Sequence, residues 1–190
     1  MLSAERFSFE LTRLSARFGE PKKERRLVLQ VSDFNRRDLD TRIRITDGHP
    51  ILIQKLGDWN AEDRQEVSLA LEPSPSSIAR LYRMLGTMLR SDNVQRVVMQ
   101  LENSLFITTE SEIKLSRQFG KGEAYSFEVE QLAPTADLLG ICRQLNLDPD
   151  LSHKDDRFWK DYSERVNLDA TLLSEQELAA LVSSYLPVAG

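Results

Sequence analysis

Two short segments of this chain place a charged residue at every second position. Residues 41–45 read Thr-Arg-Ile-Arg-Ile, and residues 126–130 read Ser-Phe-Glu-Val-Glu. Side chains along a β-strand point alternately to its two faces. The residues that share a charged strand face are therefore Arg42 with Arg44, and Glu128 with Glu130. Such strands need one apolar and one polar environment, and in a closed barrel the charged faces line a polar interior.

The composition is that of one globular domain. The chain has 190 residues, of which 41% are hydrophobic and 29% charged, so it can bury one sizeable core. Its net charge of −5 argues against general binding to nucleic acid or to an anionic membrane. Cys142 is the one cysteine, which excludes an internal disulfide and fits a reducing, cytoplasmic compartment. No stretch approaches the ~20 apolar residues that span a bilayer, and no secretory signal is present. We therefore expect one cytoplasmic domain over residues 1–190 without a membrane partner; composition leaves the oligomeric state open.

Strand patterns dominate the chain and are interrupted by helices. Strands are predicted over residues 7–12, 27–31, 40–46, 51–56, 64–71, 94–101, 104–109, 112–117 and 124–132. Asp47-Gly48 predicts a hairpin turn, and Ser74-Pro75 predicts a helix start. Further helices are predicted over residues 135–147 and 154–166, and after a capping box at Ser174. We therefore expect an α+β fold in which residues 150–190 form a helical C-terminal extension.

Several common kinds of site are not predicted. His49 and His153 have no partner at metal-ligand spacing. Gly120-Lys121-Gly122 lacks the spacing of a phosphate-binding loop and indicates a turn. Cys142 lies on the apolar side of a predicted helix, which indicates core packing. The charge run over residues 22–26 is a candidate anion contact, but a solvated loop is the better interpretation.

The remaining charged strands follow one another in a defined order. Arg42 and Arg44 come first, Lys55 follows on the returning strand, and Glu66 lies on the next one. Lys55 is either a strand end that reaches water or a ligand of an anion. A helix and more strands then precede the glutamate pair of residues 128–130. An arginine pair and a glutamate pair that face one lumen would suit a phosphate chain and the metal ion that neutralises it.

In this order the chain resembles the triphosphate tunnel enzymes, the CYTH superfamily. The matching stretches are residues 40–48, 53–55, 66–71 and 125–130, and the resemblance spans residues 5–168. It implies an eight-stranded antiparallel β-barrel with flanking helices, in which a charged tunnel binds a phosphate-rich small molecule. The chemistry is reasonable because a polyanion needs preorganised cations and divalent metals need oxygen ligands.

Carried over by position, the resemblance also implies roles for individual residues. Arg42, Arg44 and Lys55 would bind phosphate. Glu66 and Lys55 would take part in catalysis. The acids that would bind Mg²⁺ or Mn²⁺ are Glu10, Glu128 and Glu130.

Some positions depart from the family pattern. The opening Glu-x-Glu-x-Lys is represented on the predicted first strand by Glu10, without a second carboxylate or the lysine. Gln100 and Glu102 stand where the family has two basic residues, and Ser116 stands in place of a later acid. The nearby basic residues are Lys114 and Arg117. Fewer cations weaken the binding of a polyanion, and fewer carboxylates weaken the binding of a metal.

Two functions from different classes follow. The first is metal-dependent hydrolysis of an inorganic or nucleotide triphosphate. The second is a catalytically weakened tunnel that binds a nucleotide, polyphosphate or protein partner without turnover. A cyclase is a third interpretation, although no base-recognition signature is present. Phe158, Trp159 and Tyr162 either plug one mouth of the barrel or, more simply, pack on its outside.

Overall fold

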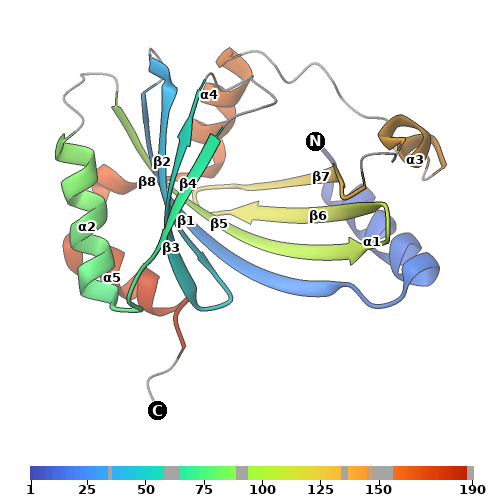
Figure 1. Ribbon diagram of the computed structural model, residues 1–190, viewed down its shortest axis with the longest axis horizontal. Coiled ribbons are helices and arrows are strands. Elements are labelled where there is room, and N and C mark those ends of the chain that lie inside the picture. Colours follow the sequence, from blue (N-terminus) through green and yellow to red (C-terminus); the bar gives the residue numbers. More distant parts are fainter. Residues whose placement is uncertain are drawn as a thin grey trace.

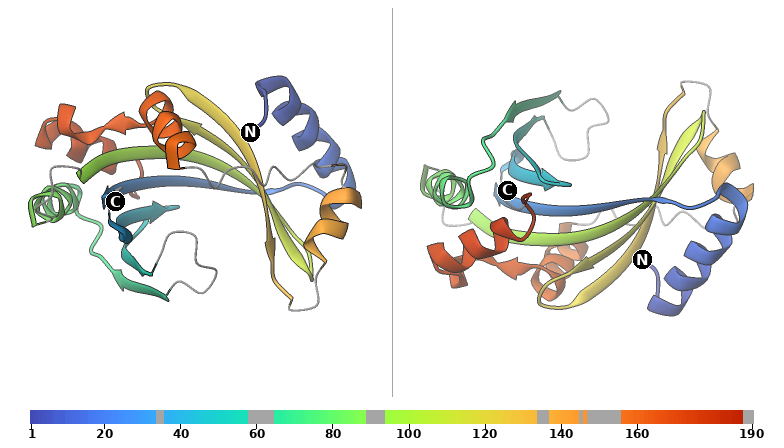
Figure 2. Two further views of the ribbon diagram at one scale, coloured as in Figure 1. Left: turned by 90° about the horizontal axis from the view of Figure 1, so that it is seen from above. Right: turned by 90° about the horizontal axis from the view of Figure 1, so that it is seen from below.

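A single antiparallel sheet organises the protein. The computed structural model describes residues 1–33, 36–57, 65–88, 94–133, 137–144, 146 and 156–187. Seven strands form a continuous sheet in the order β4-β3-β2-β1-β5-β6-β7, and a short strand β8 also pairs with β5. The strands are β1 (Lys22–Asp33), β2 (Arg36–Thr46), β3 (His49–Leu56), β4 (Gln65–Ala70), β5 (Val94–Ile107), β6 (Ser111–Phe119), β7 (Glu123–Gln131) and β8 (Leu168–Asp169). Figures 1 and 2 show that β1 and β5 run through the molecule, while β2–β4 and β6–β7 diverge from them on either side.

Helices lie at both ends of this sheet. They are α1 (Ala4–Phe18), α2 (Pro75–Met88), α3 (Leu138–Gln144), α4 (Asp156–Val166) and α5 (Glu175–Ser183), with the 3-10 helix η1 (Ala170–Leu172). In Figure 1, α2 and α5 lie together at one end, and α1 and α3 lie at the other. No helix in the described part of the chain is both long enough and apolar enough to span a membrane.

One face of the sheet is apolar and is covered by helices, and we call it the helix face. Leu27, Leu29, Ile43 and Ile45 lie on this face and pack into the main core against α2 and α5. Tyr82 of α2 is fully buried there, and its hydroxyl donates a hydrogen bond to the Gln30 carbonyl oxygen at 3.0 Å. A smaller core of Leu14, Phe106, Ile113 and Leu115 lies under α1 on the same face. The two cores hold the strands in place, and these strands carry the side chains of the opposite face.

The turn between β2 and β3 was predicted correctly. Asp47 and Gly48 have φ angles of 47° and 88°, as the Asp-Gly hairpin signal requires. A Cβ on Gly48 would come within 2.9 Å of Pro187 Cδ, so the position needs glycine for space as well as for backbone conformation. This turn sets the register of Arg42 and Arg44 against β3.

The predicted opening strand over residues 7–12 is wrong, because this segment belongs to helix α1. Phe7, Leu11 and Leu14 have the spacing of one helix face and pack on the smaller core. Ser3 caps the helix by accepting a hydrogen bond from Arg6 N at 3.1 Å. Phe9, which made the alternation look like a strand, is 57% exposed. The apolar stripe at helical spacing therefore determines the local structure, and the short alternating pattern does not.

The predicted closed barrel is also corrected. β4 and β7 are the outer strands, and hydrogen bonds between described residues do not join them. Two predicted strands, over residues 94–101 and 104–109, are one continuous strand, β5. The solvated loop expected over residues 22–26 is instead the beginning of β1. The fold is an α+β open sheet rather than a hydrogen-bonded barrel.

Candidate functional site

The face of the sheet opposite α1, α2 and α5 carries Arg26, Arg42 and Arg44, and we call it the charged face. Arg42 and Arg44 lie opposite Gln30 and Val28 of β1, while Arg26 lies opposite Thr46 of β2. Residues that are directly paired across antiparallel strands point to the same face. Three arginines from two neighbouring strands therefore project from one side of the sheet.

Lys55 and Glu66 lie on this face as well. The register aligns Asp40 of β2 with Lys55 of β3, and Lys55 with Glu66 of β4. Lys55 Nζ lies 3.4 Å from a Glu66 carboxylate oxygen. The structure thus brings four of the sequence-predicted residues, Arg42, Arg44, Lys55 and Glu66, onto neighbouring strands of one face. Their predicted roles are not tested by this placement.

Two residues of this face, Glu24 and Arg26, were missed because residues 22–26 were interpreted as a loop. Glu24 is 7% exposed, and its Oε1 lies 2.7 Å from Arg26 Nη2. The Asn103 amide also donates a hydrogen bond to Glu24 Oε1 at 2.7 Å. The signal was available, since the run continues into Leu27 without a turn residue and alternates its charges between two faces.

Arg42 is held by a carboxylate on its own strand. Its Nε and Nη2 donate to the two Asp40 oxygens, each at 2.7 Å, and Gln30 Nε2 donates to Asp40 Oδ1 at 3.1 Å. Asp40 is only 2% exposed. A bidentate guanidinium–carboxylate pair fixes the plane of both groups. Arg42 is thereby oriented before any ligand arrives.

Arg44 lies between these arginines without a comparable partner. In the part of the chain that the structure describes, no carboxylate forms an ion pair with it, and its buried Nε has no hydrogen-bond partner. Burial, and next the positive charge of Arg26, lower the pKa of the Arg44 guanidinium, and the carboxylates of Glu66 and Glu24 oppose this shift. The positive charge of Arg44 on β2 is therefore not balanced by an ion pair with a described carboxylate.

Other buried polar atoms of this face also have no partner among the described residues. They are Arg26 Nε, Thr46 Oγ1, Asn103 Oδ1 and Ser116 Oγ. Asn103 and Ser116 are directly paired across β5 and β6, and each is less than one-twentieth exposed. Buried polar groups without partners are uncommon and mark places where a ligand, water or ion completes the bonding. Unsatisfied bonding capacity thus extends from Arg44 across the face.

The predicted glutamate pair lies on β7, at the far side of the same face. Glu128 is directly paired with Lys114 of β6 and forms an ion pair with it. Glu130 is paired with Glu112, and both β7 glutamates are exposed. Tyr162 of α4 donates a hydrogen bond to Gln118 Oε1 at 2.9 Å on this side, and burial raises the pKa of its phenol to about 12. The side chains of Phe158 and Trp159 lie outside the described residues.

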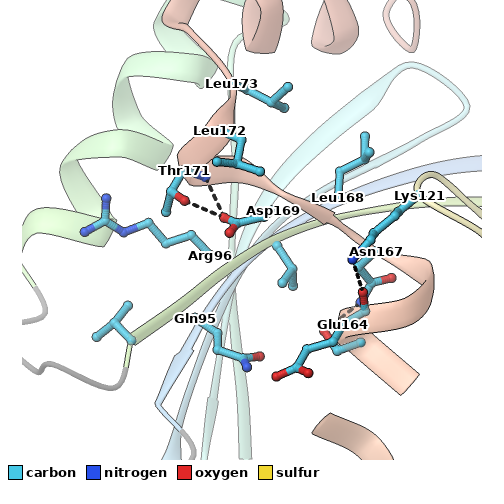
Figure 3. A pocket seen from close by; sticks show the side chains of 13 residues that line it. Gln95, Arg96, Lys121, Glu164, Asn167, Leu168, Asp169, Thr171, Leu172 and Leu173 are labelled. Atoms are coloured by element: carbon cyan, nitrogen blue, oxygen red, sulfur yellow. Dashed lines mark hydrogen bonds between the residues drawn. The ribbon is translucent and has the colours of Figure 1, made fainter. Parts of the chain in front are cut away.

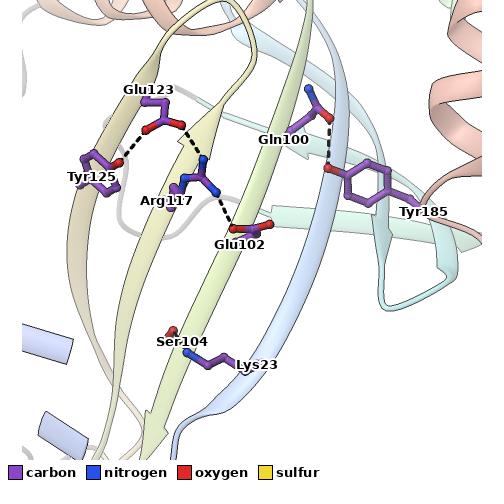
Figure 4. Close-up of polar contacts among 8 residues, drawn as sticks. All are labelled: Lys23, Gln100, Glu102, Ser104, Arg117, Glu123, Tyr125 and Tyr185. Atoms are coloured by element: carbon purple, nitrogen blue, oxygen red, sulfur yellow. Dashed lines mark hydrogen bonds and ion pairs between the residues drawn. The ribbon is translucent and has the colours of Figure 1, made fainter. Parts of the chain in front are cut away.

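Gln100, Glu102 and Arg117, which the sequence analysis considered at the positions of the family's basic pair, point to the helix face instead. Gln100 is uncharged, and its Oε1 accepts a hydrogen bond from the Tyr185 hydroxyl at 3.2 Å. Arg117 Nη1 bonds Glu102 at 3.0 Å, and its Nη2 bonds Glu123 at 2.5 Å (Figure 4). On the charged face, Leu101 occupies the β5 position opposite Arg26. The charge of Arg117 is therefore directed away from Arg44.

Glu10, the predicted metal ligand on the opening strand, lies on helix α1 instead. Its carboxylate is fully buried, and its two oxygens lie 2.5 Å from Arg6 Nη2 and 2.5 Å from Arg13 Nη2. Both partners come from neighbouring helical turns. This placement makes Glu10 a buried helix carboxylate, and we do not include it in the candidate site.

A divalent metal fits this arrangement poorly. Among the residues that the structure describes, no group of three or more His, Cys, Asp or Glu side chains is close enough to hold a metal ion. Glu24, Asp40 and Glu66 each contact a cationic side chain instead. Mg²⁺ prefers an octahedron of oxygen ligands, which these separated carboxylates do not offer. The prediction of bound Mg²⁺ or Mn²⁺ stays untested.

Two cavities lined by described residues lie away from Arg44. One, of about 720 Å³, is bounded by the start of β5 and by the segment from α4 to η1, including Arg96, Lys121 and Asp169 (Figure 3). The other, of about 430 Å³, lies by α1 on the helix face and is lined by Lys23, Arg25 and Arg117 among others. Their cations are engaged: Lys121 Nζ bonds the Glu164 carbonyl oxygen at 3.0 Å and Lys23 Nζ bonds Ser104 Oγ at 2.9 Å.

Comparison with known proteins supports the fold. No protein-family model and no curated protein sequence matches the chain. A proposed adenylate cyclase from Bacillus halodurans superposes with a TM-score of 0.57 and 14% identity, covering 84% of this chain and 94% of that one. The PH1012 protein of Pyrococcus horikoshii OT3 superposes with a TM-score of 0.53 and 15% identity, over 91% of this chain and 95% of that one. A conserved hypothetical protein of Pyrococcus furiosus superposes with a TM-score of 0.52 and 16% identity, over 77% of this chain and 87% of that one. At 14–16% identity, these likenesses show the fold alone.

Proposed function

We propose that the charged face binds a phosphate-rich anion around Arg44, with Arg26, Arg42 and Lys55 as further ligands of its oxygens. The observation that carries this proposal is the position of Arg44 between two other arginines, with a buried Nε that no described residue satisfies. Burying a charge without a partner is costly, so a bound anion would recover stability that the unliganded chain lacks.

The geometry favours a ligand with several phosphate groups. Guanidinium groups recognise phosphate oxygens in a bidentate manner, and Arg26, Arg42 and Arg44 offer three such groups on two neighbouring strands. Neighbouring side chains on one strand face are about 6.6 Å apart, so one orthophosphate can contact fewer of these arginines than a longer phosphate chain can. Affinity is therefore expected to rise from orthophosphate to pyrophosphate to tripolyphosphate.

Calorimetric titration with these three anions tests the proposal. Arg26→Gln and Arg42→Gln are each expected to weaken tripolyphosphate binding about tenfold, because each removes charge-assisted hydrogen bonds. Arg80→Gln is the matched control, since Arg80 is an exposed arginine of α2 paired with Glu175. Equal affinity for the three anions, or equal effects of the three substitutions, would contradict the proposal.

Metal-dependent hydrolysis of a triphosphate is the second candidate. It is favoured by Glu66, a carboxylate next to Lys55 that also acts on the charge of Arg44. The naming of one structural neighbour as a proposed adenylate cyclase makes a nucleoside triphosphate a reasonable substrate to include. Phosphate release from tripolyphosphate and from ATP with Mg²⁺ or Mn²⁺ tests this candidate. Turnover that is unchanged in both Glu66→Gln and Lys55→Gln would remove these residues from the catalytic assignment.

A further inference from the structure

We infer that the carboxylates of the charged face are internal counter-ions of its cations, and that a phosphate-rich ligand binds by displacing them rather than through a divalent metal held by them. This inference rests on the proposed function and specifies how the same site works. It concerns three carboxylates, Glu24, Asp40 and Glu66.

Each of these carboxylates already has a cationic partner on its own or the next strand. Glu24 contacts Arg26 at 2.7 Å, Asp40 contacts Arg42 at 2.7 Å, and Glu66 contacts Lys55 at 3.4 Å. Glu24 and Asp40 also accept hydrogen bonds from the side-chain amides of Asn103 and Gln30. In the described part of the chain, each of these acids thus contacts a cation of the face, and none of them forms an ion pair with Arg44.

The register keeps these carboxylates apart. Asp40 lies opposite Ser32 of β1, eight residues along that strand from Glu24, which corresponds to about 26 Å of extended chain. Asp40 and Glu66 are closer, but Lys55 lies directly between them in the row formed by β2, β3 and β4. A cation therefore occupies the position where a metal shared by these two carboxylates would have to bind.

Ligand binding in this arrangement is an exchange of anions. A phosphate oxygen takes the place of a carboxylate oxygen on the guanidinium or ammonium group. The exposed Glu66 carboxylate then turns to water, while the buried Asp40 and Glu24 keep their hydrogen bonds to Gln30 and Asn103. No bond is broken and no proton has to move. The carboxylates compete with the ligand, so neutralising them should tighten binding. A metal-ligand role predicts the opposite, because loss of a ligand would weaken metal-dependent binding.

The two accounts therefore differ in the sign of one effect. The full-length chain is titrated with tripolyphosphate in EDTA and, separately, in Mg²⁺. Glu66→Gln is the first variant, since Glu66 is partly exposed and its loss should not impair folding. It is expected to bind tripolyphosphate about two- to fivefold more tightly in EDTA. Glu24→Gln and Asp40→Asn keep side-chain shape and are expected to tighten binding about tenfold. Far-ultraviolet circular dichroism confirms that each variant is folded.

Glu175→Gln provides the matched control, because Glu175 pairs with Arg80 on the surface helices and should leave affinity unchanged. Weaker binding in the three variants, or wild-type binding that requires Mg²⁺, would overturn the counter-ion inference while leaving anion binding itself in place. Absence of tripolyphosphate binding by the wild-type chain under both conditions would instead overturn the proposed function, and the inference with it.

Discussion

Arg44 on β2 and Arg117 on β6 belong to the same sheet and have opposite surroundings. Arg117 is exposed and is paired with Glu123 and Glu102, whose hydrogen bonds raise the pKa of its guanidinium. Arg44 is half-buried and has no such pair in the described part of the chain, and burial lowers its pKa. One arginine has its electrostatic requirements met by the fold, whereas the other does not.

The difference separates structural charge from functional charge. An exposed, paired arginine contributes little to stability and needs no ligand to explain it. An arginine whose buried Nε has no partner is costly, and groups with perturbed pKa values are concentrated at functional sites. The proposed function therefore rests on Arg44, although the sequence pattern marks several basic residues equally.

The largest effect is expected from the core behind the arginines. Ile43 lies between Arg42 and Arg44 on β2, points to the helix face and is completely buried. Ile43→Ala should lower the free energy of unfolding by about 3 kcal/mol, because it leaves a cavity. Ile107→Ala, at a 60% exposed position on β5, is the control and should change it by less than about 0.5 kcal/mol. Urea denaturation measures both, and similar losses would contradict the described core.

A smaller effect on the free energy of unfolding is expected when either arginine is replaced by methionine, and only Arg44→Met is expected to stabilise the protein. Arg44→Met should stabilise the unliganded protein by about 1 kcal/mol, since it removes a desolvated charge and keeps a long side chain. Arg117→Met should be neutral or cost up to about 1 kcal/mol, because its ion pairs are exposed to solvent. Denaturant midpoints in phosphate-free buffer decide this. Destabilisation by Arg44→Met would show that the surrounding protein already satisfies that charge.

The smallest effect concerns the acid partner of Arg117. Hydrogen bonds from Tyr125 and Arg117 lower the pKa of Glu123 below its usual 4.5. The unfolded chain then binds this proton more readily, so the stabilising contribution is complete above about pH 4.5 and is lost as the pH falls through the lower folded value. Glu123→Gln should make unfolding less dependent on pH below 4.5. An unchanged slope in acid denaturation would show that the Glu123 contacts do not persist in solution.

Local chemistry explains which parts of the fold could be predicted. The β2–β3 hairpin was predicted because Asp47-Gly48 requires a specific turn, and that turn fixes the faces of Arg42 and Arg44. The capping box of Ser174 and Glu177 likewise predicted the start of α5, and both of its hydrogen bonds are present. Cys142 is buried, as its predicted position on an apolar helix side implied.

Competing patterns and non-local pairing explain the rest. The alternation around Phe9 indicated a strand, whereas the longer stripe from Phe7 to Leu14 made helix α1. That error placed a predicted site residue, Glu10, on a strand, and a separate one, the interpretation of residues 22–26 as a loop, left out Glu24 and Arg26. Barrel closure depends on whether β4 meets β7, and strands so distant in sequence carry no local signal for this pairing. Ion pairs across strands, such as Lys55 with Glu66, also required the register.

Tripolyphosphate binding to the wild-type chain, Arg44→Gln and Arg117→Gln, measured side by side by calorimetry in EDTA, tests the account most directly. Arg44→Gln is predicted to weaken binding by about 10- to 100-fold, because charge-assisted hydrogen bonds at the centre of the site are lost. Arg117→Gln is predicted to keep the wild-type affinity within about twofold, since its guanidinium points to the helix face and is screened by its own pairs. Equal losses in the two variants, or unchanged affinity in Arg44→Gln, would contradict the assignment of Arg44 as the centre of an anion-binding site.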